Sequence, residues 1–237
     1  MSNTYFRFKE FTIHQDKCAM KVSTDACIQG AWTPAGDAVK HVLDIGAGTG
    51  LLSLMLAQRH PGIRIDAIEL DETAVGQAAE NIAASPWAGR IKILQGDVKV
   101  YGFPRKYDMV ICNPPFFQNS LLGPNAARNN VRHNTTLELH ELAHILPQLV
   151  APSGYCSVLL PTAEARLFET LMNDEGWAVF NKLLIRPTLQ SVPNRVVSLF
   201  ASKMTGTALE EELQIYDAVN KYTTAFSTLM APFYLKL

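Results

Sequence analysis

The stretch HVLDIGAGTGLLSLMLAQRH (residues 41–60) decides the fold class of this chain. Its first part, HVLDIG, is an apolar run with β-branched residues and predicts a buried strand. TGLLSLMLAQRH follows the glycines as an apolar helix, and Pro61-Gly62 ends it. A buried strand that leads through a glycine turn into a helix is the opening unit of a parallel α/β sheet.

The same alternation continues downstream of this unit. Asp71 is a suitable N-cap for the second helix, and Pro147 is expected to kink or divide the third. The expected strands are IRIDAIEL (63–70), IKILQGD (91–97), YDMVICNPP (107–115) and GYCSVLLP (154–161), and the expected helices are DETAVGQAAENIAAS (71–85), TLELHELAHILPQLV (136–150) and AEARLFETLMNDEG (163–176).

The last two expected strands follow each other without a helix between them. They are WAVFNKLLIRP (177–187) and NRVVSLFASK (194–203), so they must be antiparallel neighbours. The arrangement resembles the Rossmann-like fold of S-adenosylmethionine (SAM) dependent methyltransferases. We therefore expect an α/β protein with a mostly parallel seven-stranded sheet and an antiparallel terminal strand.

The glycine turn carries the first functional signal. Gly46, Gly48 and Gly50 let the chain turn tightly and let a ligand approach the backbone. A dinucleotide fingerprint, G-x-G-x-x-G, needs a third glycine where this chain has Leu51, which disfavours a nicotinamide oxidoreductase. The turn instead resembles the D/E-x-G-x-G-x-G motif of SAM-dependent methyltransferases, in which an acid at the Asp44 position lies near the methionine moiety.

Two further acids lie at the ends of the next two expected strands. Glu69 can accept hydrogen bonds from both ribose hydroxyls. Asp97, followed by Val98, can accept one from the adenine amine. Ligands of such sheets bind beyond the carboxyl ends of the strands, so these residues, together with Asp44 and the three glycines, form the expected SAM site.

The fourth strand ends in Asn113-Pro114-Pro115-Phe116, the most specific motif of the chain. The Asn113 side-chain oxygen and the Pro114 carbonyl can both accept from one NH₂ group. Two acceptors favour a tetrahedral nitrogen and stabilise the positive charge that develops on it during methyl transfer. Phe116 offers a stacking face worth about 1–3 kcal/mol to a base. The tetrapeptide resembles motif IV of amino-methyltransferases.

FKEFTIHQDKCAMKVSTDACIQGAW (residues 8–32), DIGAGTGLLSLMLAQR, IELD, NPPFF and the ending LQIYDAVNKYTTAFSTLMAPFYLKL together resemble the bacterial tRNA1(Val) adenine-37 N6-methyltransferases. The resemblance spans nearly the whole chain. It implies methyl transfer to adenine N6 in tRNA, and places Lys21 and Thr24 against the methionine end of SAM. Family members often have glycine where this chain has Ser23. We expect one domain (1–237), with residues 1–40 packing on the cofactor site of a core formed by 41–237.

Basic residues that could contact RNA phosphates fall into two groups. Arg128, Arg132 and His133 lie in an expected loop after NPPF. The second group is on the terminal hairpin and in the N-terminal segment: Lys182, Arg186, Arg195, Lys203, Arg7, Lys9, Lys17 and Lys21.

Composition limits the remaining possibilities. The 237 residues carry 21 basic and 22 acidic side chains, so RNA recognition must use a local patch rather than bulk charge. No apolar stretch is long enough to cross a membrane, and the N-terminus lacks the apolar core of a secretory signal. The four cysteines and the pair His140 and His144 lack metal-site spacing. These features predict a cytoplasmic enzyme with no metal and no obligatory protein partner.

Two kinds of alternative stay open. The same motifs suit methylation of another amine: guanine N2 in rRNA, adenine N6 in DNA, or glutamine N5 in protein. A SAM-fold RNA-binding protein without catalysis is the alternative from another class, although such a protein has no need of the NPPF acceptors.

Overall fold

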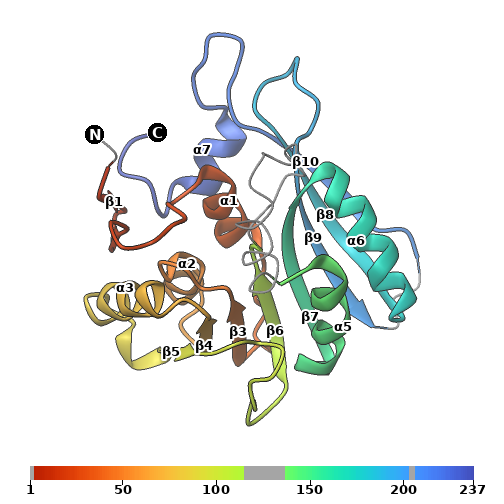
Figure 1. Ribbon diagram of the computed structural model, residues 1–237. Helices are drawn as coiled ribbons and strands as arrows, with labels where there is room; N and C mark the ends of the chain where they lie inside the picture. The colour runs from red at the N-terminus through yellow and green to blue at the C-terminus, as the bar shows by residue number, and fades with distance from the viewer. Residues whose placement is uncertain (1–2, 115–136, 203–205) are drawn as a thin grey trace, which may run out of the picture.

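The computed structural model describes residues 3–114, 137–202 and 206–237. Within these ranges the centre is an eight-stranded sheet in the order β10-β8-β9-β7-β6-β3-β4-β5. Figure 1 shows the sheet running through the molecule with helices on both sides. The strands of the sheet are β3 (His41–Ile45), β4 (Arg64–Glu69), β5 (Ile91–Gln95), β6 (Tyr107–Cys112), β7 (Val150–Pro161), β8 (Trp177–Arg186), β9 (Arg195–Ser202) and β10 (Leu209–Gln214).

The sheet confirms the expected fold class and extends it by one strand. Strands β3 to β7 pair in parallel, and β9 is antiparallel to both of its neighbours, β7 and β8. The antiparallel strand is therefore inside the sheet rather than at its edge. The edge position belongs to β10, which pairs in parallel with β8 and was missing from the sequence prediction.

Helices cover the two faces of the sheet with separate hydrophobic clusters. One cluster joins Val42 and Ile111 to α1 (Thr24–Trp32), α2 (Leu51–Arg59), α3 (Glu72–Ala83) and α7 (Thr224–Met230). The other joins Leu43 and Val110 to α5 (Leu139–Leu149) and α6 (Thr162–Asp174). Neighbouring residues of one strand serve opposite faces because strand side chains alternate. A 3₁₀ turn, η1 (Ala88–Arg90), precedes β5.

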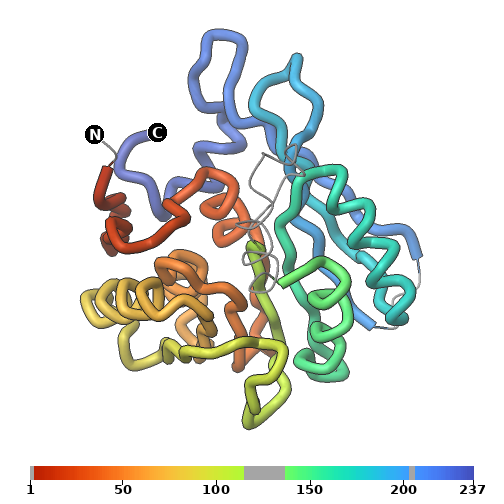
Figure 2. Tube along the Cα trace, viewed as in Figure 1, coloured from red at the N-terminus to blue at the C-terminus, as the bar shows by residue number. Residues whose placement is uncertain are grey.

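The N-terminal 40 residues also form regular elements. They form a hairpin of β1 (Tyr5–Arg7) and β2 (Thr12–His14), followed by α1. The N-cap of α1 is Ser23, whose side chain accepts from the Ala26 N–H at 3.2 Å. The two ends of the chain lie side by side (Figure 2), and the Lys9 N–H donates to the Phe233 carbonyl at 2.8 Å.

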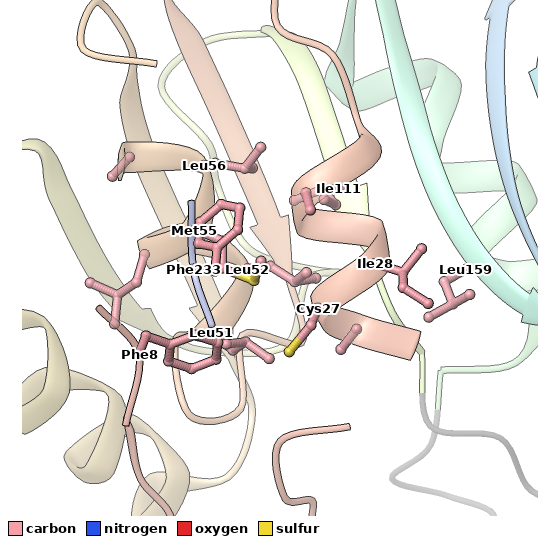
Figure 3. Close-up of a cluster of buried hydrophobic side chains, with 14 of the residues drawn as sticks. Phe8, Cys27, Ile28, Leu51, Leu52, Met55, Leu56, Ile111, Leu159 and Phe233 are labelled. Atoms are coloured by element: carbon pink, nitrogen blue, oxygen red, sulfur yellow. The ribbon is translucent and has the colours of Figure 1, made fainter. Parts of the chain in front are cut away.

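Helix α1 packs closely on α2 beside the N-terminal hairpin. Cys27 and Ile28 of α1 lie among side chains of α2 and the sheet (Figure 3). A Cβ added at Gly30 would stand 2.9 Å from the Met55 Sδ, so glycine permits this close approach. This packing holds α1 against α2 and the sheet.

Pro147 does not divide its helix. Helix α5 continues through Pro147 to Leu149, with the proline in its last turn. Only two residues of the helix follow the proline, so little helix remains to be divided. Strand β7 begins directly at Val150.

Candidate active site

Four strand ends bring the predicted cofactor and amine-binding residues to one edge of the sheet. Asp44 in β3 pairs in register with Ala67 of β4 and Ile111 of β6. Glu69 ends β4, and Asn113 directly follows β6. These strands are parallel, so their carboxyl ends share an edge, which we call the carboxyl edge of the sheet.

The glycine turn has the conformation that its sequence predicted. Gly46, Gly48 and Gly50 have φ values of 70°, 54° and 82°, a region that residues with a side chain seldom adopt. Backbone N–H groups of Gly46 and Ala47 donate to the Ile68 carbonyl at 2.9 and 3.1 Å, which ties the turn to β4. A Cβ at Gly46 would meet no atom within 4 Å, so the turn borders open space.

Glu69 holds the glycine turn in place. Its Oε2 accepts from the Gly48 N–H at 2.9 Å, while Oε1 accepts from the N–H groups of Leu70 and Asp71 at 2.8 and 3.0 Å. Each carboxylate oxygen has two lone pairs. The carboxylate therefore positions the turn and, on Oε2, keeps a lone pair for a ligand hydroxyl.

Asp44 is fully buried beneath the turn. Its Oδ2 accepts from the Ser53 N–H at 3.1 Å and from the Ser53 hydroxyl at 2.7 Å, which fixes the start of α2 on β3. The Oδ1 atom is buried and has no hydrogen-bond partner in the described structure. Burial raises the pKa of this carboxyl to about 6, although the Ser53 bonds act in the opposite direction.

Asp97 opens the turn that follows β5. Its Oδ1 accepts from the Lys99 N–H at 2.9 Å, and its carbonyl accepts from the Tyr101 N–H at 2.9 Å. The Gly96 N–H donates to the Glu69 carbonyl at 3.0 Å, which places this turn beside the end of β4. Val98 is half-buried and packs against the cluster on the α5 side of the sheet.

Asn113 presents an acceptor without a partner. Its Oδ1 is buried and has no hydrogen bond in the described structure. An unpaired buried acceptor costs about 1–3 kcal/mol, so a donor from outside the chain would be favoured here. Pro114 is buried next to it, whereas Pro115 and Phe116 lie outside the described residues.

Helix α1 is fixed to the base of this motif by a residue that sequence reasoning missed. The Gln29 Nε2 donates to the Cys112 carbonyl at 3.1 Å and to the Ser157 carbonyl at 3.3 Å. Gln29 is fully buried, and the residues it joins are far apart in the chain. No local pattern could have indicated it.

The predicted methionine-end contacts, Lys21 and Thr24, lie at the start of α1. Lys21 is exposed, and Thr24 lies near enough to Tyr234 to influence the pKa of its hydroxyl. Asp25, in the first turn, pairs with Arg195 at 3.2 Å. The N-cap Ser23 has an extended backbone with φ −116°, so a residue other than glycine is accommodated without strain.

A second missed residue connects the N-terminal segment to the glycine turn. The Asn81 side chain on α3 exchanges two hydrogen bonds with the His14 backbone, both 2.9 Å. The same Nδ2 donates to the Thr49 carbonyl at 2.9 Å. The only sequence signal was a polar residue on the apolar side of a helix.

Most of the expected RNA-contacting cations that can be located already have partners. Lys17 pairs with Glu80 at 2.7 Å, Lys182 with Glu169 at 2.9 Å, and Arg186 with Glu212. Lys9 donates to the Ala231 carbonyl, and Arg7 is exposed. The other expected contacts, Arg128, Arg132, His133 and Lys203, lie outside the described residues.

Within the described ranges, no group of three or more His, Cys, Asp or Glu side chains could hold a metal ion. His144 contacts Glu175 at 3.0 Å rather than His140. The four cysteines are buried and free. No described helix is both long and apolar enough to cross a membrane.

Comparison with solved structures identifies the fold. An Agrobacterium tumefaciens protein described as a predicted O-methyltransferase matches 88% of this chain and 96% of its own, with a TM-score of 0.67 at 16% identity. A glycopeptide N-methyltransferase in complex with SAM matches 78% of this chain and 96% of its own, with a TM-score of 0.56 at 12% identity. The fold is that of the Rossmann-like SAM-dependent methyltransferases.

Sequence comparison then gives the family. Residues 33–138 match the model of the methyltransferase small domain. Relatives named tRNA1(Val) (adenine(37)-N6)-methyltransferase include one from Tolumonas auensis, 40% identical over 100% of this chain and 99% of its own, and one from Dyadobacter fermentans, 41% identical over 99% and 98%. A Bacteroides fragilis relative is 39% identical over 100% of both chains. The chain belongs to the family of these full-length relatives and is a SAM-dependent methyltransferase.

The residues at the carboxyl edge suit SAM. A Cβ at Gly46 would project into open space beside the turn. Because glycine leaves this space free, a ligand can lie against the backbone there. Asp44 Oδ1 is an unused acceptor of the kind that a ligand ammonium group requires, and Glu69 retains acceptor capacity for hydroxyls. These are the chemical needs of an amino acid and a ribose joined in one ligand.

Proposed function

We propose that this protein transfers a methyl group to the exocyclic N6 amine of an adenine in tRNA, at the position named by its relatives, adenine 37 of tRNA1(Val). The observation that carries the proposal is the buried Oδ1 of Asn113 just after β6, which has no hydrogen-bond partner among the described residues. Relatives that carry this function in their names align over the full chain at about 40% identity. The family resemblance and the site chemistry therefore point the same way.

The cofactor roles follow from the groups that remain available. SAM, when bound, supplies a methyl group activated by the positive charge of its sulfonium. We assign the glycine turn to the cofactor backbone contact, Glu69 to the ribose, and Asp97 with Val98 to the adenine. Asp44, Lys21 and Thr24 are assigned to the methionine end.

Asn113 and Pro114 are assigned to the target amine. The lone pair of an exocyclic amine is spread into the base ring, so the nitrogen is a weak nucleophile. Acceptance of its two hydrogens by the Asn113 amide oxygen and the Pro114 carbonyl favours the tetrahedral form. The same acceptors stabilise the charge that develops on nitrogen. Phe116 is assigned to stacking on the base, which must leave its stack to reach the site.

Removal of the Asn113 acceptor tests this assignment. In Asn113→Ala we expect kcat to fall about 10²–10³-fold, as for loss of one charge-stabilising group, while affinity for S-adenosylhomocysteine stays within about threefold. Asn113→Asp is the matched control, because it keeps an oxygen at the same position and should retain more activity than the alanine variant. Near-wild-type turnover of Asn113→Ala would exclude the acceptor role.

The substrate is tested separately. Methyl groups labelled from SAM should enter tRNA rather than rRNA, DNA or protein, and nucleoside mass spectrometry should find N6-methyladenosine. Label recovered as N2-methylguanosine in rRNA, or as methylglutamine in protein, would replace the tRNA assignment by one of the other amines. Binding of SAM without transfer to any fraction would favour a non-catalytic binding protein.

The remaining general properties of the protein are also proposals. We propose that it works in the cytoplasm as one domain spanning residues 1–237, without a metal or an obligatory protein partner. The contacts of His14 and of α1 with the site region support a role for residues 1–40 in packing on the cofactor site.

A further inference from the structure

The opposite edge of the sheet, where the parallel strands begin, carries a row of cations. We call this row the amino-edge strip. Its members lie just before or within the first residues of four adjacent strands, β6, β3, β4 and β5, and all are exposed. They are Lys40, Arg64, Lys92, Arg105 and Lys106.

Strand register places these residues next to one another. His41, which follows Lys40, pairs with Arg64, and Asp66 pairs with Lys92. Adjacent strands are about 4.8 Å apart, so four strands spread the strip over about 15 Å. Figure 1 shows the connection into β6 at the bottom of the molecule, away from the loops after β8 and β10 at the top.

The charges of the strip are not neutralised by the described part of the chain. No ion pair within 4 Å joins any strip residue to an acid there. The nearby Asp108 accepts from the backbone N–H groups of Lys40 and His41, both at 2.8 Å, and Asp66 accepts from the Tyr107 hydroxyl. Arg64 is close enough to Arg90 to lower the pKa of that guanidinium, in addition to the larger effect of burial.

Several cations elsewhere on the protein differ from the strip because each is paired with an acid. Lys17, Lys182 and Arg186 each have an acid within reach, whereas the strip keeps like charges together. The whole chain has 21 basic against 22 acidic side chains, so this local excess is not a consequence of composition. Arg105 hydrogen-bonds the ring of His41 at 2.9 Å, but this contact supplies no negative charge. Closely spaced cations without an acidic partner gain most from a partner with regularly spaced negative charges.

We propose that the amino-edge strip binds the phosphate backbone of RNA, outside the candidate active site at the carboxyl edge. The proposal takes its partner class from the proposed function and adds a second contact surface on the opposite edge of the sheet. The phosphates could come from a distant part of the same tRNA or from a separate structured RNA. The chemistry of the contact is the same in both cases.

The test compares two double variants with the same change of charge. Arg64→Gln with Lys106→Gln removes two strip cations, and Arg166→Gln with Lys236→Gln removes one exposed Arg and one exposed Lys elsewhere. Affinity for an unmodified tRNA1(Val) transcript is measured over a series of salt concentrations. We expect the strip variant to bind about tenfold more weakly near 0.1 M salt, with a slope of log K against log [salt] smaller by about 2. The control should change affinity less than twofold.

Two RNA probes identify the source of the phosphates. If full-length tRNA loses affinity in the strip variant but a hairpin of the anticodon stem and loop does not, the strip contacts the body of the same tRNA. If an unrelated structured RNA loses affinity equally, the strip serves RNA in general. Both results support the proposal.

Other results overturn it. Equal losses in the strip and control variants would mean that only net charge matters. Unchanged RNA affinity, with strip-dependent binding to vesicles of phosphatidylserine and phosphatidylcholine, would assign the strip to a lipid surface instead. Melting temperatures of both double variants, measured first, show that each is folded.

Failure of the proposed function gives a different pattern. A strip that binds RNA in a protein that methylates no tRNA would leave this inference standing and remove the catalytic one. Methyl transfer to saturating tRNA with an unchanged kcat, but without any strip-dependent affinity, would do the reverse. Asn113→Ala should leave the strip-dependent part of RNA binding unchanged.

Discussion

The two edges of the sheet are built from the same strands and have opposite chemistry. At the carboxyl edge, acids follow strands and hold backbone N–H groups of a glycine turn, as Glu69 does for Gly48. At the amino edge, an acid also holds backbone N–H groups, since Asp108 accepts from Lys40 and His41. There, however, the surrounding side chains are cations. The comparison shows that one structural device, a carboxylate on backbone N–H groups, can serve either a ligand site or a strand start.

The largest expected effect separates the two carboxylates. Glu69→Gln should weaken S-adenosylhomocysteine binding by about 10–100-fold, because hydrogen bonds to a charged acceptor contribute about 1.5–3 kcal/mol. Asp108→Asn, the matched change at the amino edge, should leave this affinity within about twofold. Isothermal titration calorimetry on both variants decides the point, and equal losses would show that Glu69 acts only on stability.

The next effect concerns side chains that stabilise each edge. Asn81→Ala removes three hydrogen bonds to the backbone of His14 and Thr49, and should lower the free energy of unfolding by about 2–3 kcal/mol. Arg90→Met removes bonds to the carbonyls of Ala57, His60 and Ile63 at the amino edge and should also destabilise the protein. Urea unfolding measures both.

Ligand affinity distinguishes these two variants. Thr49 belongs to the glycine turn, so Asn81→Ala should weaken S-adenosylhomocysteine binding about fivefold at a temperature where it is folded. Arg90→Met should not. If both variants kept full affinity, the link between the N-terminal segment and the turn would have no role in binding.

A further effect is a pH dependence confined to the carboxyl edge. The pKa of Asp44 is raised from 3.8 to about 6 in the folded protein. The stability due to this group is therefore present below about pH 4 and is lost as the pH rises through about 6. A cationic ligand group favours the carboxylate, so affinity for S-adenosylhomocysteine should increase about tenfold per pH unit up to about pH 6.

Calorimetry in buffers of different ionisation enthalpy checks this dependence. Wild-type protein should release a proton on binding near pH 5.5, and Asp44→Asn should not. Proton release that persists in the variant would assign the titration to another group.

The smallest expected effect concerns a cation that already has a partner. Lys182→Gln should change tRNA affinity less than twofold, because Lys182 is paired with Glu169. The pair is partly buried, with side chains 20% and 23% exposed, and ion pairs near the surface contribute about 0–1 kcal/mol, so stability should change little. A loss as large as that of the strip variant would show that the terminal hairpin takes part in RNA binding.

Much of the fold followed from local pattern. Buried strands with β-branched residues, glycine turns and the absence of a helix between residues 177 and 203 were enough to predict the parallel core and the hairpin. Strand β10 was missed because LEEELQ has three consecutive glutamates, and four of its six residues are exposed. It is held by pairing with β8, including the Arg186 and Glu212 contact, and this tertiary interaction overrides local propensity.

The arrangement of the candidate site residues could be predicted where the side-chain chemistry coincides with position in the chain. Asp44, Glu69, Asp97 and Asn113 each lie at a strand end, and the parallel sheet brings such ends together. Gln29, Ser53 and Asn81 were not predicted, because their roles depend on partners supplied by other elements. The pairing of Lys17, Lys182 and Arg186 with acids was hidden for the same reason.

The contact between Lys9 and Phe233 has a consequence for the order of assembly during synthesis. Phe8 and Tyr234 also lie 6.1 Å apart between ring centroids, so the N-terminal hairpin packs on residues that are translated more than 200 positions later. The hairpin is synthesised first, but its packing partner is absent until Phe233 has been translated. Tyr234, from the same late segment, lies near Thr24. Under the proposed assignment of Thr24, the methionine end of the cofactor site would be among the last parts of the enzyme to be completed.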